Sequence, residues 1–215
     1  MCGRYTLRRI NWYRDIKGFP PSAFDEFSET KVRFNVAPSQ LVPIIVNEEG
    51  RPKLSAARWG FTPHWADENQ KLKPINAKCE TVITSPMFRE AFRRRRCLIP
   101  ADGFYEWQAA KPPKVPHFIH MKDDSVFAFA GIREGDTCAI LTTTANDVLR
   151  PIHDRMPVIV DPSEYDRWLG EADVAGLLRP CEAEKMEAYP ISTRVNNVRN
   201  DGPELVERAE SISSS

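Results

Sequence analysis

The feature that most constrains the fold is the spacing of 18 prolines, which separate the apolar runs of this 215-residue chain. Because most of these prolines lie between short apolar runs, the spacing indicates many short strands and loops. The short runs between the prolines are rich in Phe, Ile, Val and Tyr, a composition typical of strands. We expect strands at 42–47, 54–60, 97–100, 103–108, 116–121, 126–131 and 138–143.

Turn and helix signals complete this outline. Glu49-Gly50 lies between the first two strands and predicts a hairpin. Ser85-Pro86 and Pro162 each place a proline where a helix begins, a position that tolerates it. A further short helix is expected at 202–208. Strands interspersed with a few helices predict an α+β fold, with one domain over residues 1–208 and a disordered tail at 209–215.

Composition excludes several functional classes. Thirty basic and thirty acidic residues give zero net charge, so a nucleic-acid-binding protein of this composition needs a local basic groove. No apolar run approaches the ~20 residues that span a bilayer, and no secretory signal is present, which predicts a cytoplasmic protein with no membrane partner. Five scattered cysteines without a C-x-x-C pair favour neither a disulfide framework nor a zinc site, and we expect no metal or cofactor.

The first residues, Met1-Cys2-Gly3-Arg4-Tyr5, have a distinctive chemistry. Removal of Met1 would leave Cys2 with a free α-amine beside its thiol, a pair that no internal cysteine offers. Such a 1,2-aminothiol condenses with an aldehyde to an imine, and the sulfur then closes a thiazolidine ring. Both groups titrate near ~8 to ~8.5, close to working pH. The alternative is that Cys2 is an ordinary residue beside the start site.

The segment Pro100–Trp107 holds the strongest internal signal. Asp102-Gly103 predicts a tight turn, and the next residues alternate as a strand with Glu106 on the face of Phe104. A carboxylate among aromatic residues is suited to general acid catalysis, because partial burial raises its pKa. A buried structural ion pair is the alternative.

Other polar residues stand in apolar surroundings. His153 can move a proton near neutral pH, and the adjacent Arg155 can bind a phosphate, although a packed turn would explain the same segment. Asn76 could hold a ligand through its amide or only turn the backbone. The loop containing Trp65 could cap the core or stack on a base. The arginines at 93–96 indicate a solvated helix end or a phosphate contact.

Together these segments resemble the SOS-response-associated peptidase family of abasic-site-processing proteins. The resemblance is collinear from residue 2 to about residue 206. It rests on Met1–Tyr5, Asn35–Pro38, Trp59–Phe61 with Pro63 and Trp65, Asn76-Ala77 with Glu80, Pro100–Trp107, Thr142–Ala145, His153–Pro157, Pro190–Ser192 and Val195-Asn196.

The resemblance implies a distorted antiparallel β-barrel-like core with peripheral helices. It also implies a protein, expected to be monomeric, that crosslinks through Cys2 to abasic sites in single-stranded DNA. Asn76, Glu106 and His153 match the active-site positions of the family. Arg4 and Arg155 match positions that hold the DNA backbone, and the partner extends to single-strand/double-strand junctions. If the source is bacterial, the protein is expected at the nucleoid.

We expect Lys78 to join Arg4 and Arg155 in a basic groove and Trp65 to stack on a base or wedge a duplex end. Two departures from the family pattern affect this groove: Lys78 replaces an arginine found in some members, and Pro86 stands where some have a further arginine. Three other functions remain open, namely a peptidase with Cys2 as nucleophile, an abasic-site lyase and a non-covalent single-strand binder.

Overall fold

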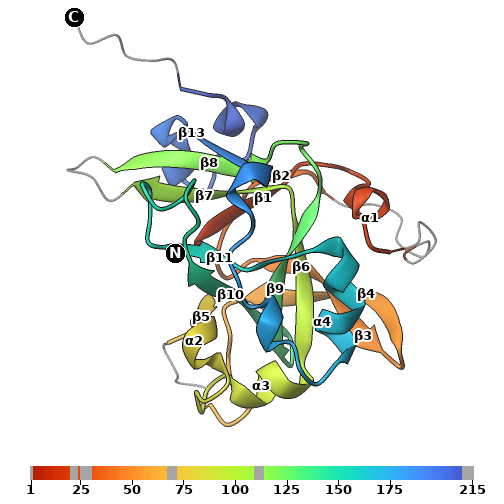
Figure 1. Cartoon of the computed structure of the whole chain (residues 1–215). Helices are drawn as coiled ribbons and strands as arrows, with labels where there is room; N and C mark the ends of the chain where they lie inside the picture. Colours follow the sequence, from red (N-terminus) through yellow and green to blue (C-terminus); the bar gives the residue numbers. More distant parts are fainter. Residues whose placement is uncertain (1, 20–23, 25–30, 67–71, 109–113, 210–215) are drawn as a thin grey trace, which may run out of the picture.

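The computed structural model describes residues 2–19, 24, 31–66, 72–108 and 114–209, which form two β-sheets with short helices around them (Figure 1). One sheet has the spatial order β13 (Met186–Pro190), β8 (Val115–Met121), β7 (Gly103–Gln108), β1 (Arg4–Leu7) and β2 (Arg33–Val36). The other has the order β11 (Arg155–Pro157), β10 (Thr137–Thr144), β4 (Arg51–Trp59), β3 (Leu41–Glu48), β6 (Arg96–Ala101), β9 (Phe127–Glu134) and β12 (Ile159–Val160). A further strand, β5 (Asn76–Lys78), pairs with β10.

The second sheet closes on itself. Strand β10 pairs with β9 as well as with β4, so β4, β3, β6, β9 and β10 form a ring. This ring confirms the expected α+β fold with a barrel-like core. The β10–β4 pairing is parallel, which departs from the antiparallel expectation. The reason is geometric: strand directions cannot alternate all the way around a ring with an odd number of strands, so one pairing must be parallel.

The hairpin expected around Glu49-Gly50 is confirmed as the β3–β4 connection. Glu49 has φ 53° and Gly50 has φ 81°, so both central residues are left-handed, as a two-residue hairpin turn requires. The Asn47 side chain accepts a hydrogen bond from the Gly50 amide at 2.9 Å, which fixes the turn locally. The other five expected strands are also present, as β6 to β10.

Helices are short and lie outside the sheets, at α1 (Trp12–Asp15), α2 (Cys79–Val82), α3 (Arg89–Arg94) and α4 (Tyr165–Gly170) (Figure 1). Ser85 accepts hydrogen bonds from the amides of Phe88 and Arg89, so the proline forms a turn and α3 begins later than the sequence predicts. Short 3-10 helices lie at Pro162–Glu164, Ala175–Leu177, Ala183–Lys185, Thr193–Asn196 and Pro203–Val206.

The Pro162 signal is confirmed. Asp161 caps the first turn by accepting a hydrogen bond from the Ser163 amide at 3.0 Å, and α4 follows directly. The segment expected to be helical at 202–208 forms a 3-10 helix instead, over Pro203–Val206. Of the tail expected at 209–215, residues 210–215 lie outside the described part of the chain.

The arginine run at 93–96 is not a uniformly solvated helix end. Arg96 is buried and donates to the carbonyl oxygens of Trp168, at 2.6 Å, and Phe92, at 2.8 Å. Arg95 forms an ion pair with Glu134 at 2.7 Å. These two arginines therefore join α3 to neighbouring elements, because a buried guanidinium is stable only where carbonyl or carboxylate groups satisfy its donors.

The core fills the ring and the space between the ring and the five-stranded sheet. Tyr5 of β1 makes edge contacts with Trp59 and Phe129, with ring centroids 5.4 and 5.8 Å apart. Gly103, at the start of β7, has no room for a side chain, because a Cβ atom there would overlap the ring of Phe118. The Gly103 contact thus packs β7 tightly against β8 within the first sheet, and that sheet packs onto the ring through Tyr5 of β1. No helix among the described residues is long and apolar enough to cross a membrane.

We expect Gly103→Ala to lower the free energy of unfolding by about 1–3 kcal/mol, because the added methyl group overpacks the contact with Phe118. Gly176→Ala is the matched control, since a Cβ atom at that position meets nothing within 4 Å. Denaturant unfolding of the two variants and the parent measures both changes. Equal stabilities for all three proteins would contradict this packing argument.

Candidate active site at the start of the chain

Cys2 lies two residues before the first residue of β1, a strand that pairs with β2 on one side and with β7 on the other. Chain ends usually fray, but pairing on both edges draws this end into the interior. The Cys2 side chain is fully buried, and its sulfur lies 3.8 Å from the Arg4 carbonyl oxygen. Figure 1 shows the chain start between β7 and the strands β5, β10 and β11.

Asn76 reaches Cys2 from the second sheet. Strand β5 runs parallel to β10, with Asn76 opposite Ile140, and the Asn76 side-chain nitrogen donates to the Cys2 carbonyl oxygen at 2.9 Å. The amide oxygen of Asn76 is buried and accepts no hydrogen bond from the described residues. Because a buried acceptor without a donor is costly, this oxygen marks a place for a donor on a bound group.

Glu106 approaches the same point from β7. Arg4 lies opposite Tyr105, so the antiparallel register continued by one residue places Glu106 opposite Gly3. The Glu106 side chain is only 3% exposed, and one of its oxygens accepts a hydrogen bond from the Trp107 amide at 3.3 Å. The expectation of a carboxylate buried among aromatic residues is confirmed in its geometry.

The environment of the Cys2 thiol favours its neutral form. Burial raises the pKa of Cys2 well above its ordinary value, and the negative charge of Glu106 raises it further. A neutral thiol is a weak nucleophile, so reaction at this sulfur requires a group that takes its proton. Glu106, whose charge acts on this thiol, is a candidate for that group.

His153 lies on the turn that precedes β11. The backbone amide of His153 donates to the Leu149 carbonyl at 2.8 Å, and Gln108 at the end of β7 donates to the Pro151 carbonyl at 3.2 Å. This contact holds the turn against the strand that carries Glu106. The His153 Nδ1 atom accepts a hydrogen bond from the Arg155 amide at 3.0 Å and lies 2.7 Å from a carboxylate oxygen of Asp154.

Arg155 is largely buried and already holds a carboxylate. Its two terminal nitrogens donate to the Glu80 oxygens at 2.6 and 2.9 Å, and one of them also donates to the Thr142 carbonyl at 2.6 Å. Hydrogen bonding from Arg155 lowers the pKa of Glu80 to about 2, so Glu80 is ionised at any physiological pH. The sequence motif contained Glu80, but no pattern in the sequence paired it with Arg155.

Arg4 faces the C-terminal part of the chain. It donates to the Asn35 side chain at 2.9 Å and to the Val195 carbonyl at 2.8 Å, and burial lowers its pKa. Asn35 in turn donates to the carbonyl oxygens of Val195, Asn197 and Asn200. The structure therefore gives Arg4 and Asn35 a role in joining β1 and β2 to the segment at 195–200. Contact of Arg4 with DNA stays a prediction.

Lys78 and Trp65 are at the surface. Lys78 lies two residues beyond Asn76 on β5, and no ion pair joins it to another described residue. Trp65 is 55% exposed, in contrast to the buried Trp59 of the same motif. Both positions are accessible to a partner, and their contacts with DNA stay predictions.

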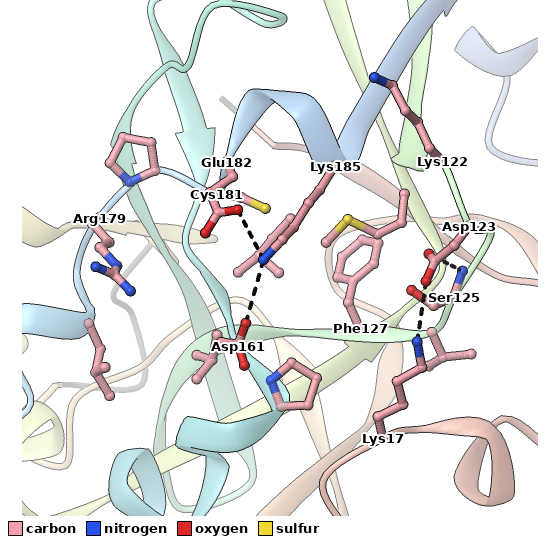
Figure 2. A pocket seen from close by; sticks show the side chains of 17 residues that line it. Lys17, Lys122, Asp123, Ser125, Phe127, Asp161, Arg179, Cys181, Glu182 and Lys185 are labelled. Atoms are coloured by element: carbon pink, nitrogen blue, oxygen red, sulfur yellow. Dashed lines mark hydrogen bonds and ion pairs between the residues drawn. The ribbon is translucent and has the colours of Figure 1, made fainter.

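A separate cavity of about 540 Å³ lies between the β8–β9 turn, β12 and the segment at 177–185 (Figure 2). Its floor is apolar, with Phe127 near the middle of the view. Ion pairs border it, with Lys185 close to Asp161 at 3.8 Å and Glu182 at 3.1 Å. None of the predicted site residues lines this cavity.

A closed ring of strands carries a buried cysteine near the start of the chain, and an asparagine and a glutamate converge on that cysteine. This fold and this site together define the class of protein to which the chain belongs. The family model for SOS response associated peptidase (SRAP) matches residues 1–198. The chain belongs to this family, as its motifs predicted.

Two relatives of this chain are both named abasic site processing proteins. The chain is 41% identical to the abasic site processing protein YoqW of Bacillus subtilis, over 96% of this chain and 99% of the relative. It is 31% identical to the abasic site processing protein YedK of Escherichia coli, over 81% and 84% of the two chains. A crystal structure of a protein from Bacteroides thetaiotaomicron, 26% identical, superposes with a TM-score of 0.81 over 97% of this chain and all of that one.

We expect Glu106→Gln to lower the pKa of the Cys2 thiol, because the variant removes a negative charge that disfavours the thiolate. At a given alkaline pH the variant then holds more thiolate and reacts faster. The measurement is the pH profile of Cys2 alkylation, read by mass spectrometry of the N-terminal peptide. Glu90→Gln, which removes an exposed carboxylate on α3, is the control. An unchanged or raised pKa in Glu106→Gln would show that the two groups do not interact.

Proposed function

We propose that the protein captures abasic sites in single-stranded DNA as a covalent thiazolidine at Cys2 after Met1 is removed. The observation that carries this proposal is the convergence of Asn76 and Glu106, from two different sheets, on a fully buried Cys2 next to the chain start. The names of the relatives YoqW and YedK support the substrate class.

Removal of Met1 comes first. While Met1 is present, the Cys2 nitrogen is part of the peptide bond to Met1, so it is not nucleophilic. Hydrolysis of that bond adds one water, releases methionine and frees the α-amine. The buried thiol of Cys2 and the carboxylate of Glu106 are the groups in place to perform it, which would make this step a single-turnover peptidase reaction.

The crosslink then forms in two steps. The α-amine adds to the open-chain aldehyde of the abasic sugar, and loss of one water gives an imine. The sulfur adds to the imine carbon, its proton moves to the nitrogen, and the five-membered ring closes. Glu106 gives a proton to the ring oxygen as the sugar opens and recovers one from the hemiacetal hydroxyl. It then protonates the hydroxyl that leaves as water and regains a proton from the nitrogen as the imine forms. On ring closure it relays the thiol proton to that nitrogen.

Asn76 and His153 complete the site. The Asn76 oxygen, which has no donor among the described residues, accepts from the α-amine and holds it beside the aldehyde. His153 acts from the neighbouring turn and moves a proton at the sugar hydroxyl and at the imine. Reversal of the crosslink needs the same exchange in the opposite direction.

The DNA backbone lies along the exposed side of this site. Lys78 and Arg155 follow the edge formed by β5, β10 and β11, and they bind flanking phosphates without selecting a sequence. Trp65 stacks on a base or on the end of a duplex at a junction. Arg4 supports the groove from inside through its bonds to the segment at 195–196.

Three alternatives share these residues and differ in their product. A lyase would leave a cleaved strand, because an imine that is not trapped by sulfur undergoes β-elimination. A peptidase acting on other chains would release peptides. A non-covalent single-strand binder would show salt-dependent binding but no covalent product. The buried sulfur at the chain start favours the crosslink, because ring closure removes the imine.

Cys2→Ala is expected to abolish the heat-stable product with abasic single-stranded DNA and to keep the fold, since only Cys2 can become an aminothiol. Denaturing electrophoresis after incubation with an abasic oligonucleotide measures the product. Cys181→Ala is the control and should crosslink normally, because Cys181 lies at the separate cavity. A protein whose Met1 is retained behind an uncleaved tag should not react. A normal yield from Cys2→Ala would exclude the thiazolidine.

Glu106→Gln and His153→Ala are expected to affect different steps. Glu106→Gln keeps the shape of the side chain but cannot give up a proton, so the forward rate should fall several-fold or more, within the roughly 10²–10⁴ range of general acid–base catalysis. His153→Ala should slow release of the DNA more than its capture. Time courses of crosslinking and of transfer to a competitor abasic strand separate the two rates. Equal effects of both changes on both rates would contradict this division.

A further inference from the structure

The guanidinium of Arg155 is held by two very different partners, and one of its terminal nitrogens donates to both of them. On the inner side, the Thr142 carbonyl oxygen accepts at 2.6 Å and belongs to the ring strand β10. On the outer side, the Glu80 carboxylate accepts from both terminal nitrogens. The Arg155 side chain is 12% exposed, whereas that of Glu80 is 46% exposed. The arginine is therefore fixed, and the carboxylate covers it from the solvent side.

This arrangement uses the part of the guanidinium that recognises phosphate. An arginine binds a phosphate or a carboxylate through two parallel N–H donors, and both groups compete for the same fork. Glu80 occupies both terminal nitrogens of Arg155. A phosphate oxygen pair can reach that fork only if the Glu80 carboxylate leaves it.

We propose that Glu80 is a displaceable occupant of the Arg155 fork, and that it sets the affinity of the groove for DNA phosphates. This inference rests on the proposed function, since it assumes that DNA passes along this edge. A phosphate replaces the carboxylate, Thr142 keeps the guanidinium in place, and Glu80 turns into solvent from its position in the short helix α2.

The charges near this fork are consistent with exchange. Lys78 lies on β5 directly before α2, and no ion pair holds it among the described residues. Lys78 lies opposite Thr142 in the β5–β10 register, and Thr142 accepts from Arg155. In this proposal, a phosphate at the fork therefore interacts with Lys78 as well as with Arg155. Because the chain has no net charge, affinity for DNA at this edge depends on local cations such as Arg155 and Lys78.

The test compares Glu80→Gln with Glu90→Gln for binding to an unmodified single-stranded oligonucleotide, which separates binding from crosslinking. Both changes remove one carboxylate, and the two side chains are almost equally exposed, at 46% and 47%, each paired with an arginine. Glu80→Gln should bind about two- to fivefold tighter, the range of a half-exposed ion pair, whereas Glu90→Gln should match the parent. The salt slope of Glu80→Gln should steepen by up to roughly 0.7.

The same change made in an Arg155→Ala protein tests whether the gain in DNA binding depends on Arg155. In that background Glu80→Gln should give no gain, because there is no fork to release. Thermal unfolding of each variant shows that it is folded, and Glu80→Ala serves as a second variant. Weaker or unchanged binding by Glu80→Gln, while the parent binds, would overturn displacement and leave the proposed function standing. Failure of every protein to bind DNA at low salt would overturn both.

Discussion

The placement of β1 between β2 and β7 is the constraint on which the rest of the structure depends. Strand β1 has only four residues, so its order must come from pairing on both edges and from side-chain contacts. Asp102, fully buried, supplies several: it accepts from the Thr6 hydroxyl at 2.6 Å, the Arg8 amide at 2.5 Å and the Arg8 guanidinium at 3.0 Å. A buried carboxylate satisfied in this way is stable, whereas loss of its partners would leave it costly.

The two sheets meet at the candidate site, and this explains its composition. Cys2 and Glu106 come from the five-stranded sheet, whereas Asn76 comes from the branch strand β5 on the closed ring. Residues on separate sheets keep their distances only if the sheets pack rigidly. The edge contacts of Tyr5 with Trp59 and Phe129, and of Phe104 with Phe129, provide that packing. The distances between the site residues therefore depend on the packing of the core between the two sheets.

The arginines of this protein differ in how their charges are satisfied. The molecule as a whole has no net charge, and several of its arginines are satisfied internally by carbonyl oxygens or carboxylates. Arg4 and Arg96 donate to backbone carbonyl oxygens of distant segments and so join parts of the chain, and contact of Arg4 with DNA stays a prediction. Arg155 differs from them because an exposed carboxylate covers its outer side. This difference is the basis of the proposal that a phosphate takes the place of that carboxylate.

The sequence by itself determined the local features. Proline spacing and apolar runs predicted seven strands, Glu49-Gly50 predicted the hairpin, and the aminothiol chemistry of Cys2 follows from covalent structure alone. These depend on neighbouring residues only. Tertiary structure decided the parallel closure of the ring, the inward turn of Arg96, the bonds of Arg4 to residues near 195, and the pairing of Glu80 with Arg155. Each joins residues distant in the chain, and composition and periodicity carry no information about which distant groups satisfy one another.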